Sequence, residues 1–324
     1  MNSFIKKIQT FSKRFDLWEK DSRIVVGVSG GPDSACLLDV LNKLKNKYEL
    51  DILVVHVNYG LRGKEADEDE KFTQDLVEKR GLKIEKLKLD SLKIDNSNLE
   101  SELRMIRFDF FEKIRKENKF DIIAVAHNQD DQAETVLMRM MRGAGLQGLG
   151  SIRPKNGKII RPLLKTSRKE ILEYLKDNDL NYRVDSTNKD IKFFRNKVRH
   201  NLIPYLEKEY NPAIKETLAG AAESISDDYD FINKNTRKIV EKICSIKGNE
   251  IKLSVEEFKK LHPALQKQAL RQSILKIKKN LVDIENSHIE EILKVIKSHK
   301  GKSQEIEFKG LKVARKGDKL QISI

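Results

Sequence analysis

The most informative stretch of this chain is the run Arg23-Ile-Val-Val-Gly-Val-Ser-Gly-Gly-Pro-Asp-Ser34. Its first half, 23–28, is short, apolar and β-branched, which is typical of a buried strand. Its second half, 29–34, leads through two glycines and a proline into the helical pattern of 35–44. A strand that turns through glycines into a helix leaves the first N–H groups of that helix free for an anion. We therefore predict a phosphate-binding loop over 29–34.

The chemistry of this loop differs from that of a Walker A loop, because no Gly-Lys-Ser/Thr follows its glycines. It carries a carboxylate, Asp33, which suits a phosphate site if it holds Mg²⁺. A structural glycine turn would explain the glycines, but not the two serines and the carboxylate around them. We predict that Asp33 is a metal ligand and that the ATP-binding residues are Ser29, Gly30, Gly31, Pro32, Asp33 and Ser34.

The residues beyond this run alternate between strand and helix patterns. Apolar strands are predicted over 51–57, 83–89 and 121–126, and helices over 65–80, 99–114 and 132–142. Short strands that alternate with helices predict a Rossmann-like parallel sheet of the α/β class, with the ligand crevice beyond the carboxyl ends of its strands. An edge strand is expected within 157–164, and 181–199 is predicted to be a polar loop.

A second, smaller domain of the mostly helical α+β class is expected after Asn211-Pro212, which is a helix-start signal. We predict a catalytic domain over 1–211 and a domain over 212–324 that opens with a long connecting helix. Ser254 and Ser287 are each followed three residues later by Glu, so both predict a capping box. Alternation in 305–324 predicts a small antiparallel sheet.

Composition bounds the functional classes. The 324 residues are 39% hydrophobic and contain no membrane-length apolar run, and the only cysteines, Cys36 and Cys244, exclude a disulfide framework or a four-Cys metal site. We expect a cytoplasmic protein. The net charge is +14, and half of it lies in 220–324, with 22 Lys+Arg against 15 Asp+Glu. Either a polyanion partner or a lysine-rich surface would explain this charge.

Further motifs follow the other strands and the third helix. They are His56-Val-Asn-Tyr-Gly-Leu-Arg-Gly63, Glu100-x-x-x-Arg104-x-x-Arg107, Ala126-His-Asn-Gln-Asp-Asp-Gln-Ala-Glu-Thr135, Arg161-Pro-Leu-Leu164, Asp185-Ser-Thr-Asn188 and Arg195-Asn-x-x-Arg199. The loop at 29–34 resembles the PP-loop of the N-type ATP pyrophosphatases. The whole set, in this order, resembles the tRNA(Ile)-lysidine synthases, densely over 20–210 and more weakly to the end of the chain.

This resemblance implies a fold of the adenine nucleotide alpha hydrolase type and a ligase that turns ATP into AMP and pyrophosphate. The family adenylates the C2 oxygen of the wobble cytidine in a CAU-anticodon isoleucine tRNA, and lysine then displaces AMP. The product, lysidine, changes decoding from AUG to AUA and the tRNA identity from Met to Ile. The implied ligands are ATP, Mg²⁺, free L-lysine and that tRNA, with no membrane partner, and a homodimer stays open as an assembly.

The resemblance also implies roles for individual residues. Arg107 is placed near the adenylate charge, and His56 near the nucleotide. His127, Asp131 and Glu134 are placed with Asp33 in the catalytic site, and Arg195 and Arg199 on the tRNA. Each has a structural alternative: a buried core histidine, an acidic helix start favoured by the dipole, or a solvated arginine.

Two other functions compete with this interpretation. A PP-loop tRNA thiolase would need a persulfide cysteine or a cluster, and the motif loops contain no cysteine. A tRNA-binding protein without catalysis could retain the loop as a relic, but Asp33 and the acids of 130–134 favour an enzyme. We interpret the basic second domain as the tRNA-docking module.

Overall fold

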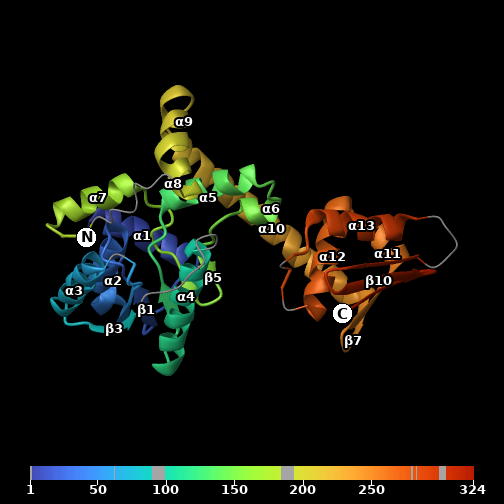
Figure 1. Cartoon of the computed structure of the whole chain (residues 1–324), viewed down its shortest axis with the longest axis horizontal. Helices are drawn as coiled ribbons and strands as arrows, with labels where there is room; N and C mark the ends of the chain where they lie inside the picture. Colours follow the sequence, from blue (N-terminus) through green and yellow to red (C-terminus); the bar gives the residue numbers. More distant parts are fainter. Residues whose placement is uncertain are drawn as a thin grey trace. The chain divides into compact units, whose positions relative to one another are not determined.

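The computed structural model describes residues 2–61, 63–89, 99–183, 193–278, 280–281, 283–298 and 304–324. The chain divides into two compact units, Met1–Ser226 and Asp227–Ile324. The helix α10 (Ile214–Ile243) runs through this division, so it contributes residues to both units (Figure 1). The domain boundary that the sequence predicts, at 211/212, stays a prediction.

A mostly parallel sheet forms the centre of the first unit. Its strands are β1 (Arg23–Gly27), β2 (Asp51–Asn58), β3 (Lys83–Lys88), β4 (Ile122–Ala124), β5 (Lys155–Asn156) and β6 (Ile159–Ile160). The spatial order is β3-β2-β1-β4-β6-β5, and only β5 runs antiparallel. From β1 the chain adds β2 and β3 on one side, and it then returns to add β4 on the other side of β1, so the order in which strands are added reverses between β1 and β4. In open α/β sheets the ligand crevice lies at such a reversal, beyond the carboxyl ends of the strands.

Both faces of this sheet are buried, because successive side chains of a strand point to opposite faces. Ile24 and Val26 pack into a core with helices α1 (Ser3–Arg14), α2 (Pro32–Tyr48) and α7 (Arg168–Asp177). Val25, between them, packs with α4 (Leu99–Glu117). The remaining helical segments of this unit are α3 (Lys64–Glu78), α5 (Gln129–Met141), α6 (Leu146–Leu149), α8 (Phe194–Lys197), η2 (Val198–Leu202) and α9 (Ile203–Glu209).

The second unit packs helices against an antiparallel sheet of order β7-β8-β11-β10-β9. Its strands are β7 (Cys244–Lys247), β8 (Glu250–Ser254), β9 (Gln304–Phe308), β10 (Leu311–Lys316) and β11 (Lys319–Ser323). Its helices besides α10 are α11 (Val255–Lys259), α12 (Pro263–Ile277) and α13 (Asn286–Lys297). The predicted fold class, a Rossmann-like domain with a smaller α+β domain, is confirmed. In the described part of the chain no helix is long and apolar enough to cross a membrane.

Three local predictions are wrong. Residues 193–199 are not loop: Val198, which is 2% exposed, packs with Ala133 and Ile203, and this contact drives 194–202 into helix. The helix α13 is capped by a box between Glu285 and His288, rather than by Ser287. The strand β6 lies inside the sheet, because β5 pairs with its outer side and forms the edge. Residues 184–192 lie outside the described part of the chain.

Candidate active site

The loop after β1 meets the turn after β4 at the reversal of the sheet. Asn128, which caps the N-terminus of α5, donates from Nδ2 to Asp33 Oδ1 over 3.0 Å. These two residues are 95 positions apart in the sequence, and the parallel pairing of β1 with β4 brings them together. The predicted phosphate loop and the predicted acidic helix start therefore share one site.

The phosphate loop is held by its own hydroxyl groups. The Ser29 N–H donates to Ser34 Oγ over 3.1 Å, and Ser34 Oγ donates to the Gly31 carbonyl over 2.9 Å. Gly31 is the N-cap of α2 and provides no side-chain cap, and Pro32 begins the helix. The first N–H groups of α2 thus have no side-chain acceptor, which is the arrangement that suits a phosphate oxygen.

Gly30 is required by its backbone conformation. Its φ is +84°, and a Cβ there would lie 2.9 Å from Thr73 Oγ1. The Gly30 carbonyl accepts from the Arg183 N–H over 2.9 Å, so the loop is anchored from a distant segment. A side chain at residue 30 would face both the strain of positive φ and a steric contact.

Each oxygen of the Asp33 carboxylate accepts a hydrogen bond from another side chain. Arg168, the first residue of α7, donates from Nη1 to Asp33 Oδ2, while Asn128 occupies Oδ1. Burial raises the pKa of Asp33, although the Arg168 charge opposes the rise. Arg168 is itself positioned through its backbone N–H, which donates to Asp130 Oδ1 over 2.8 Å.

A metal at Asp33 would need most of its ligands from elsewhere. Within the described residues, no three His, Cys, Asp or Glu side chains gather as a metal site. Mg²⁺ is commonly bound by one or two carboxylates together with substrate phosphates and waters, so a single carboxylate beside a phosphate loop fits it. A cation at Asp33 Oδ2 would have to displace Arg168.

Two arginines cover the acidic pair of α5. Glu134 is 1% exposed and accepts from Arg195 Nε over 2.7 Å and from Arg199 Nε over 2.5 Å. Asp131 Oδ1 accepts from Arg195 Nη2 over 2.8 Å and from Arg199 Nη2 over 3.3 Å. The two guanidinium groups predicted to contact tRNA therefore face carboxylates here, and their tRNA role stays a prediction.

Asp131 serves the helix as well as the site. Its Oδ2 accepts from the Asn128 N–H over 3.0 Å, and the Asn128 side chain accepts from the Asp131 N–H over the same distance. Burial acts to raise the pKa of Asp131, but the Arg195 charge and these other interactions hold it below its ordinary value. Asp131 is thus a helix-capping residue and an ionised group facing the site at once.

His127 is a neutral imidazole with a defined tautomer. Arg161 Nε donates to His127 Nδ1 over 3.3 Å, so the ring proton is on Nε2. Burial lowers the pKa of His127 to about 3, with Asp131 opposing and Arg161, Arg104 and Arg107 adding to the fall. His127 can donate a hydrogen bond from Nε2, but it does not take up a second proton, and so carries no positive charge, at neutral pH.

Arg107, whose charge acts on His127, has a buried N–H donor. Its Nε is buried and has no hydrogen-bond partner among the described residues. Its guanidinium lies 5.3 Å from the centre of the Phe108 ring, and its charge acts on His127. A buried guanidinium nitrogen without an acceptor suits an anion, because an unpaired buried donor is costly.

His56 lies under the loop at the carboxyl end of β2. It is 4% exposed, and its Nδ1 donates to the Val28 carbonyl over 2.8 Å, which leaves Nε2 without a proton. Burial lowers the pKa of His56, so it is a neutral acceptor. The neighbouring motif residue Arg62 and the motif 185–188 lie outside the described residues.

Sequence reasoning missed Asn128, Arg161 and Arg168 as site residues. Asn128 carried a helix-cap signal, and Arg161 stood in the Arg-Pro-Leu-Leu motif. Arg168 had no signal of its own, because its partner Asp33 is 135 residues away. Their roles depend on which segments the sheet brings together.

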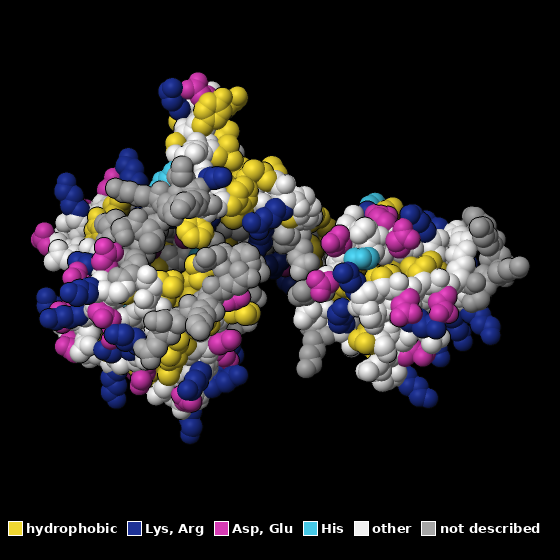
Figure 2. All heavy atoms as spheres, in the orientation of Figure 1, with side chains coloured by type: hydrophobic (Ala, Val, Ile, Leu, Met, Phe, Trp, Pro, Cys, Tyr) yellow, Lys and Arg dark blue, Asp and Glu magenta, His cyan; other side chains and the backbone are white. Residues whose placement is uncertain are grey.

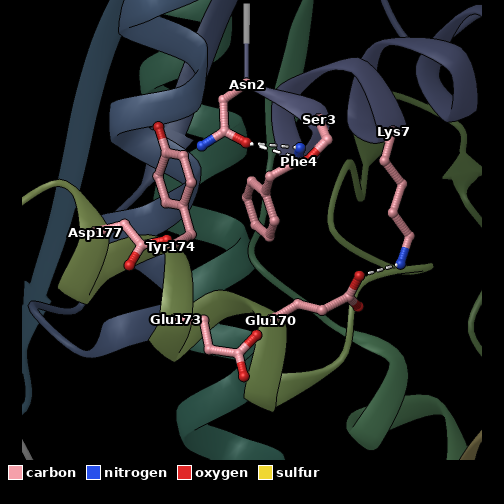
Figure 3. Close-up of a pocket in the computed structure, with 8 residues that line it drawn as sticks. All are labelled: Asn2, Ser3, Phe4, Lys7, Glu170, Glu173, Tyr174 and Asp177. Carbon is pink, nitrogen blue, oxygen red and sulfur yellow. Dashed lines mark hydrogen bonds and ion pairs between the residues drawn. The ribbon is translucent and has the colours of Figure 1, made fainter.

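A separate hollow of about 350 Å³ lies between α1 and α7 (Figure 3). It contains the carboxylates of Glu170, Glu173 and Asp177, and Lys7 Nζ lies 2.6 Å from Glu170 Oε1. None of the predicted site residues lines it. The chemistry of the candidate site is therefore concentrated at the loop and not in this hollow.

Family models match most of the first unit and most of the second. A PP-loop domain model matches 1–206, and a TilS substrate-binding domain model matches 253–321. A tRNA(Ile)-lysidine synthase of Caldanaerobacter subterraneus is 38% identical over 90% of this chain and 63% of its own length. One of Solibacter usitatus is 34% identical over 95% of this chain and 69% of its own length.

Among solved structures, a U34-tRNA thiolase of Methanococcus maripaludis superposes with a TM-score of 0.57. It is 24% identical and covers 69% of this chain and 78% of its own, so it shows the fold alone. This chain spans a little under two thirds of the first curated relatives that it matches, at 63% and 62% of their lengths.

Proposed function

Because this chain belongs to the tRNA(Ile)-lysidine synthase family, we propose that it joins lysine to the wobble cytidine of a CAU-anticodon isoleucine tRNA at the expense of ATP. The observation that supports this most directly is the meeting of Asp33, in the phosphate loop, with the acidic start of α5. One site then offers a place for a triphosphate next to a place for an ammonium group.

The proposed reaction has two steps. The C2 oxygen of the cytidine attacks the α-phosphorus of ATP, and pyrophosphate leaves. The ε-amine of free L-lysine, after losing a proton, then attacks C2, and AMP leaves with the oxygen. In both steps negative charge develops on phosphate oxygens, those of the leaving pyrophosphate and then those of the leaving AMP, so positioned cations and N–H donors are the main source of rate.

The triphosphate would lie on the loop. The N–H groups at the start of α2 and the hydroxyls of Ser29 and Ser34 would donate to its oxygens. Bound Mg²⁺ would neutralise phosphate charge there. For Asp33 to bind that cation, Arg168 must leave Asp33 Oδ2, and its guanidinium is then free beside the phosphates.

The adenylate would lie beside Arg107 of α4 and His127, which follows β4. Arg107 Nε, which is buried without a partner among the described residues, would donate to an α-phosphate oxygen. His127 would donate from Nε2 to the same phosphate and would stay neutral throughout. His56, with its proton on Nδ1, would present Nε2 as an acceptor to the nucleotide.

The lysine substrate would bind through its ammonium charge at Asp131 and Glu134. These carboxylates already bind the cations of Arg195 and Arg199, so they form a pre-built cation site. Arg195 and Arg199 would turn toward tRNA phosphates when lysine takes their place. The basic second unit, which matches a substrate-binding domain, would bind the rest of the tRNA. A homodimer stays a prediction.

A thiolase activity is less well supported by the residues present. The sequence has two cysteines, and Cys36 is buried in α2, where burial raises the pKa of its thiol. A buried thiol with a raised pKa is a poor nucleophile. Cys244 belongs to the second unit, which does not contain the loop.

The test supplies ATP, radiolabelled lysine and isoleucine tRNA with a CAU anticodon. Label should become attached to the tRNA, with one AMP and one pyrophosphate formed per lysine attached. A tRNA in which uridine replaces the wobble cytidine should take up none. The variant Asp33→Asn should lose AMP formation and keep its circular dichroism spectrum. AMP formation at the wild-type rate in that variant would exclude the proposed role of the loop.

A further inference from the structure

An apolar groove lies at the far end of α5 from the acidic pair. It has a volume of about 360 Å³ and is lined by Met141, Phe194, Lys197, Val198, Asn201, Leu202 and Tyr205. Three of these side chains are large, apolar and well exposed: Met141 at 51%, Phe194 at 41% and Tyr205 at 54%. Figure 2 shows hydrophobic side chains gathered on the projection that carries α9. Such a concentration of exposed apolar surface is typical of a binding site.

Cationic and amide groups stand among these rings. Arg142 lies over the Phe194 ring at 5.5 Å, and Lys197 and Asn201 line the groove. Aromatic faces flanked by Arg, Lys and Asn are the combination that binds unpaired bases of RNA: rings stack on the base, cations contact the phosphate, and amides reach the base edges. Among the residues that the structure describes, no acidic side chain lines the groove.

The groove shares its wall with the candidate active site. The segment α8–η2 directs Arg195 and Arg199 to Glu134, while Phe194, Lys197 and Asn201 line the groove. Along α5, Asp131 and Met141 are ten residues apart, which is about 15 Å in a helix. A nucleotide in the groove would therefore be a neighbour of the reacting one, and not the reacting one itself.

We propose that this groove binds an unpaired base of the tRNA anticodon loop that flanks the reacting cytidine. That the RNA is this tRNA rests on the proposed function, whereas the binding of an unpaired base rests on the residues that line the groove. By holding a flanking nucleotide, the groove would fix which cytidine reaches the site between Asp33 and Glu134. The test separates RNA from another occupant, a second copy of this chain.

The test uses the full chain and a 17-nucleotide RNA stem-loop with the CAU anticodon and 2-aminopurine in the position next to the reacting cytidine. Binding to the wild-type protein should quench the 2-aminopurine fluorescence, because the base stacks on a ring. Tyr205→Ala should weaken stem-loop binding about tenfold and abolish the quench. Tyr205→Trp should restore both, since it keeps a stacking surface. Phe231→Ala, which removes an aromatic ring that is 70% exposed in the second unit, is the matched control.

Several outcomes would overturn the proposal. Equal stem-loop affinity and quench in the wild type and Tyr205→Ala would show that the groove takes no base. A loss of oligomers in Tyr205→Ala by sedimentation, with RNA affinity unchanged, would assign the groove to a second copy. Groove-dependent RNA binding in a wild-type protein that attaches no lysine would instead refute the proposed function and leave the groove assignment standing. ATP affinity should be equal in all variants, and this equality would show that the phosphate loop over 29–34 is intact.

Discussion

Arg168 Nη1 donates to Asp33 Oδ2, and this ion pair joins the start of α7 to the phosphate loop across 135 residues of sequence. Asn128 donates to the other oxygen of the same carboxylate. Both oxygens of the Asp33 carboxylate therefore accept a hydrogen bond from a side chain. In the function proposed above, a cation would bind Asp33 in exchange for Arg168.

The Asp33–Arg168 pair should be energetically coupled. Arg168→Gln should lower the free energy of unfolding by about 1 kcal/mol, because Asp33 would then accept a hydrogen bond from the Asn128 amide but lose its ion pair. The expected loss is small because Arg168 is 39% exposed and solvent screens its charge. In a protein that already carries Asp33→Asn, Arg168→Gln should leave the free energy of unfolding almost unchanged. Urea unfolding of the four proteins measures this double-mutant cycle. Additive effects would mean that the two side chains are not paired in solution, and Lys7→Gln, in an exposed pair with Glu170, serves as the control.

Glu134→Gln should destabilise the protein far more than a matched change elsewhere. Glu134 is 1% exposed, and its loss would remove one of the two carboxylates, Glu134 and Asp131, that pair with Arg195 and Arg199, at a cost of about 3 kcal/mol. Glu223→Gln is the control, because Glu223 also lies between two cations, Arg14 and Lys165, but both of these are more exposed. We expect that control to lose less than about 1 kcal/mol. If Glu134→Gln and Glu223→Gln lowered the free energy of unfolding equally in chemical denaturation, the buried pairing of Glu134 with Arg195 and Arg199 would be contradicted.

His127 should make the protein sensitive to mild acid. In the unfolded chain a histidine takes up a proton below about pH 6.5, whereas in the folded protein the pKa of His127 is about 3. The unfolded state therefore binds more protons between these values, and stability falls as the pH falls, by at most about 1.4 kcal/mol per pH unit. His127→Asn should remove this slope between pH 6.5 and 4.5 in urea unfolding. The same slope in both proteins would show that His127 titrates normally.

The two loop glycines should respond differently to alanine. Gly30→Ala should lower the free energy of unfolding by about 1–2 kcal/mol and weaken ATP binding, because φ is +84° and the new Cβ would lie 2.9 Å from Thr73 Oγ1. Gly31→Ala is the control: residue 31 has φ −73°, and among the described residues its Cβ would meet Ser29 Oγ at 3.5 Å, an ordinary contact distance. Thermal melts and ATP titrations measure both. A Gly30→Ala protein as stable as Gly31→Ala would refute the required left-handed turn.

Much of the fold could be predicted because its signals are local. The apolar runs of β1, β2 and β4 and the glycine turn after β1 identify the parallel sheet and its phosphate loop. Periodicity also predicted most helices of the first unit. It failed at 193–199, since Val198 is helical through its contact with Ala133 on α5, which no short window of sequence contains.

Residue types and spacing identify most of the chemical groups that we assign to the candidate site: a carboxylate and two hydroxyls in the loop, and a histidine and two acids after β4. The arginine on α4 is identified only through the family resemblance, because spacing alone predicts a solvated side chain. What each of these groups contacts depends on the folded chain. Arg168 reaches Asp33, Arg195 and Arg199 reach Glu134, and Arg161 sets the tautomer of His127. Such contacts depend on distances between segments far apart in the chain, and these distances are set by the order of the strands and the packing of helices on the sheet.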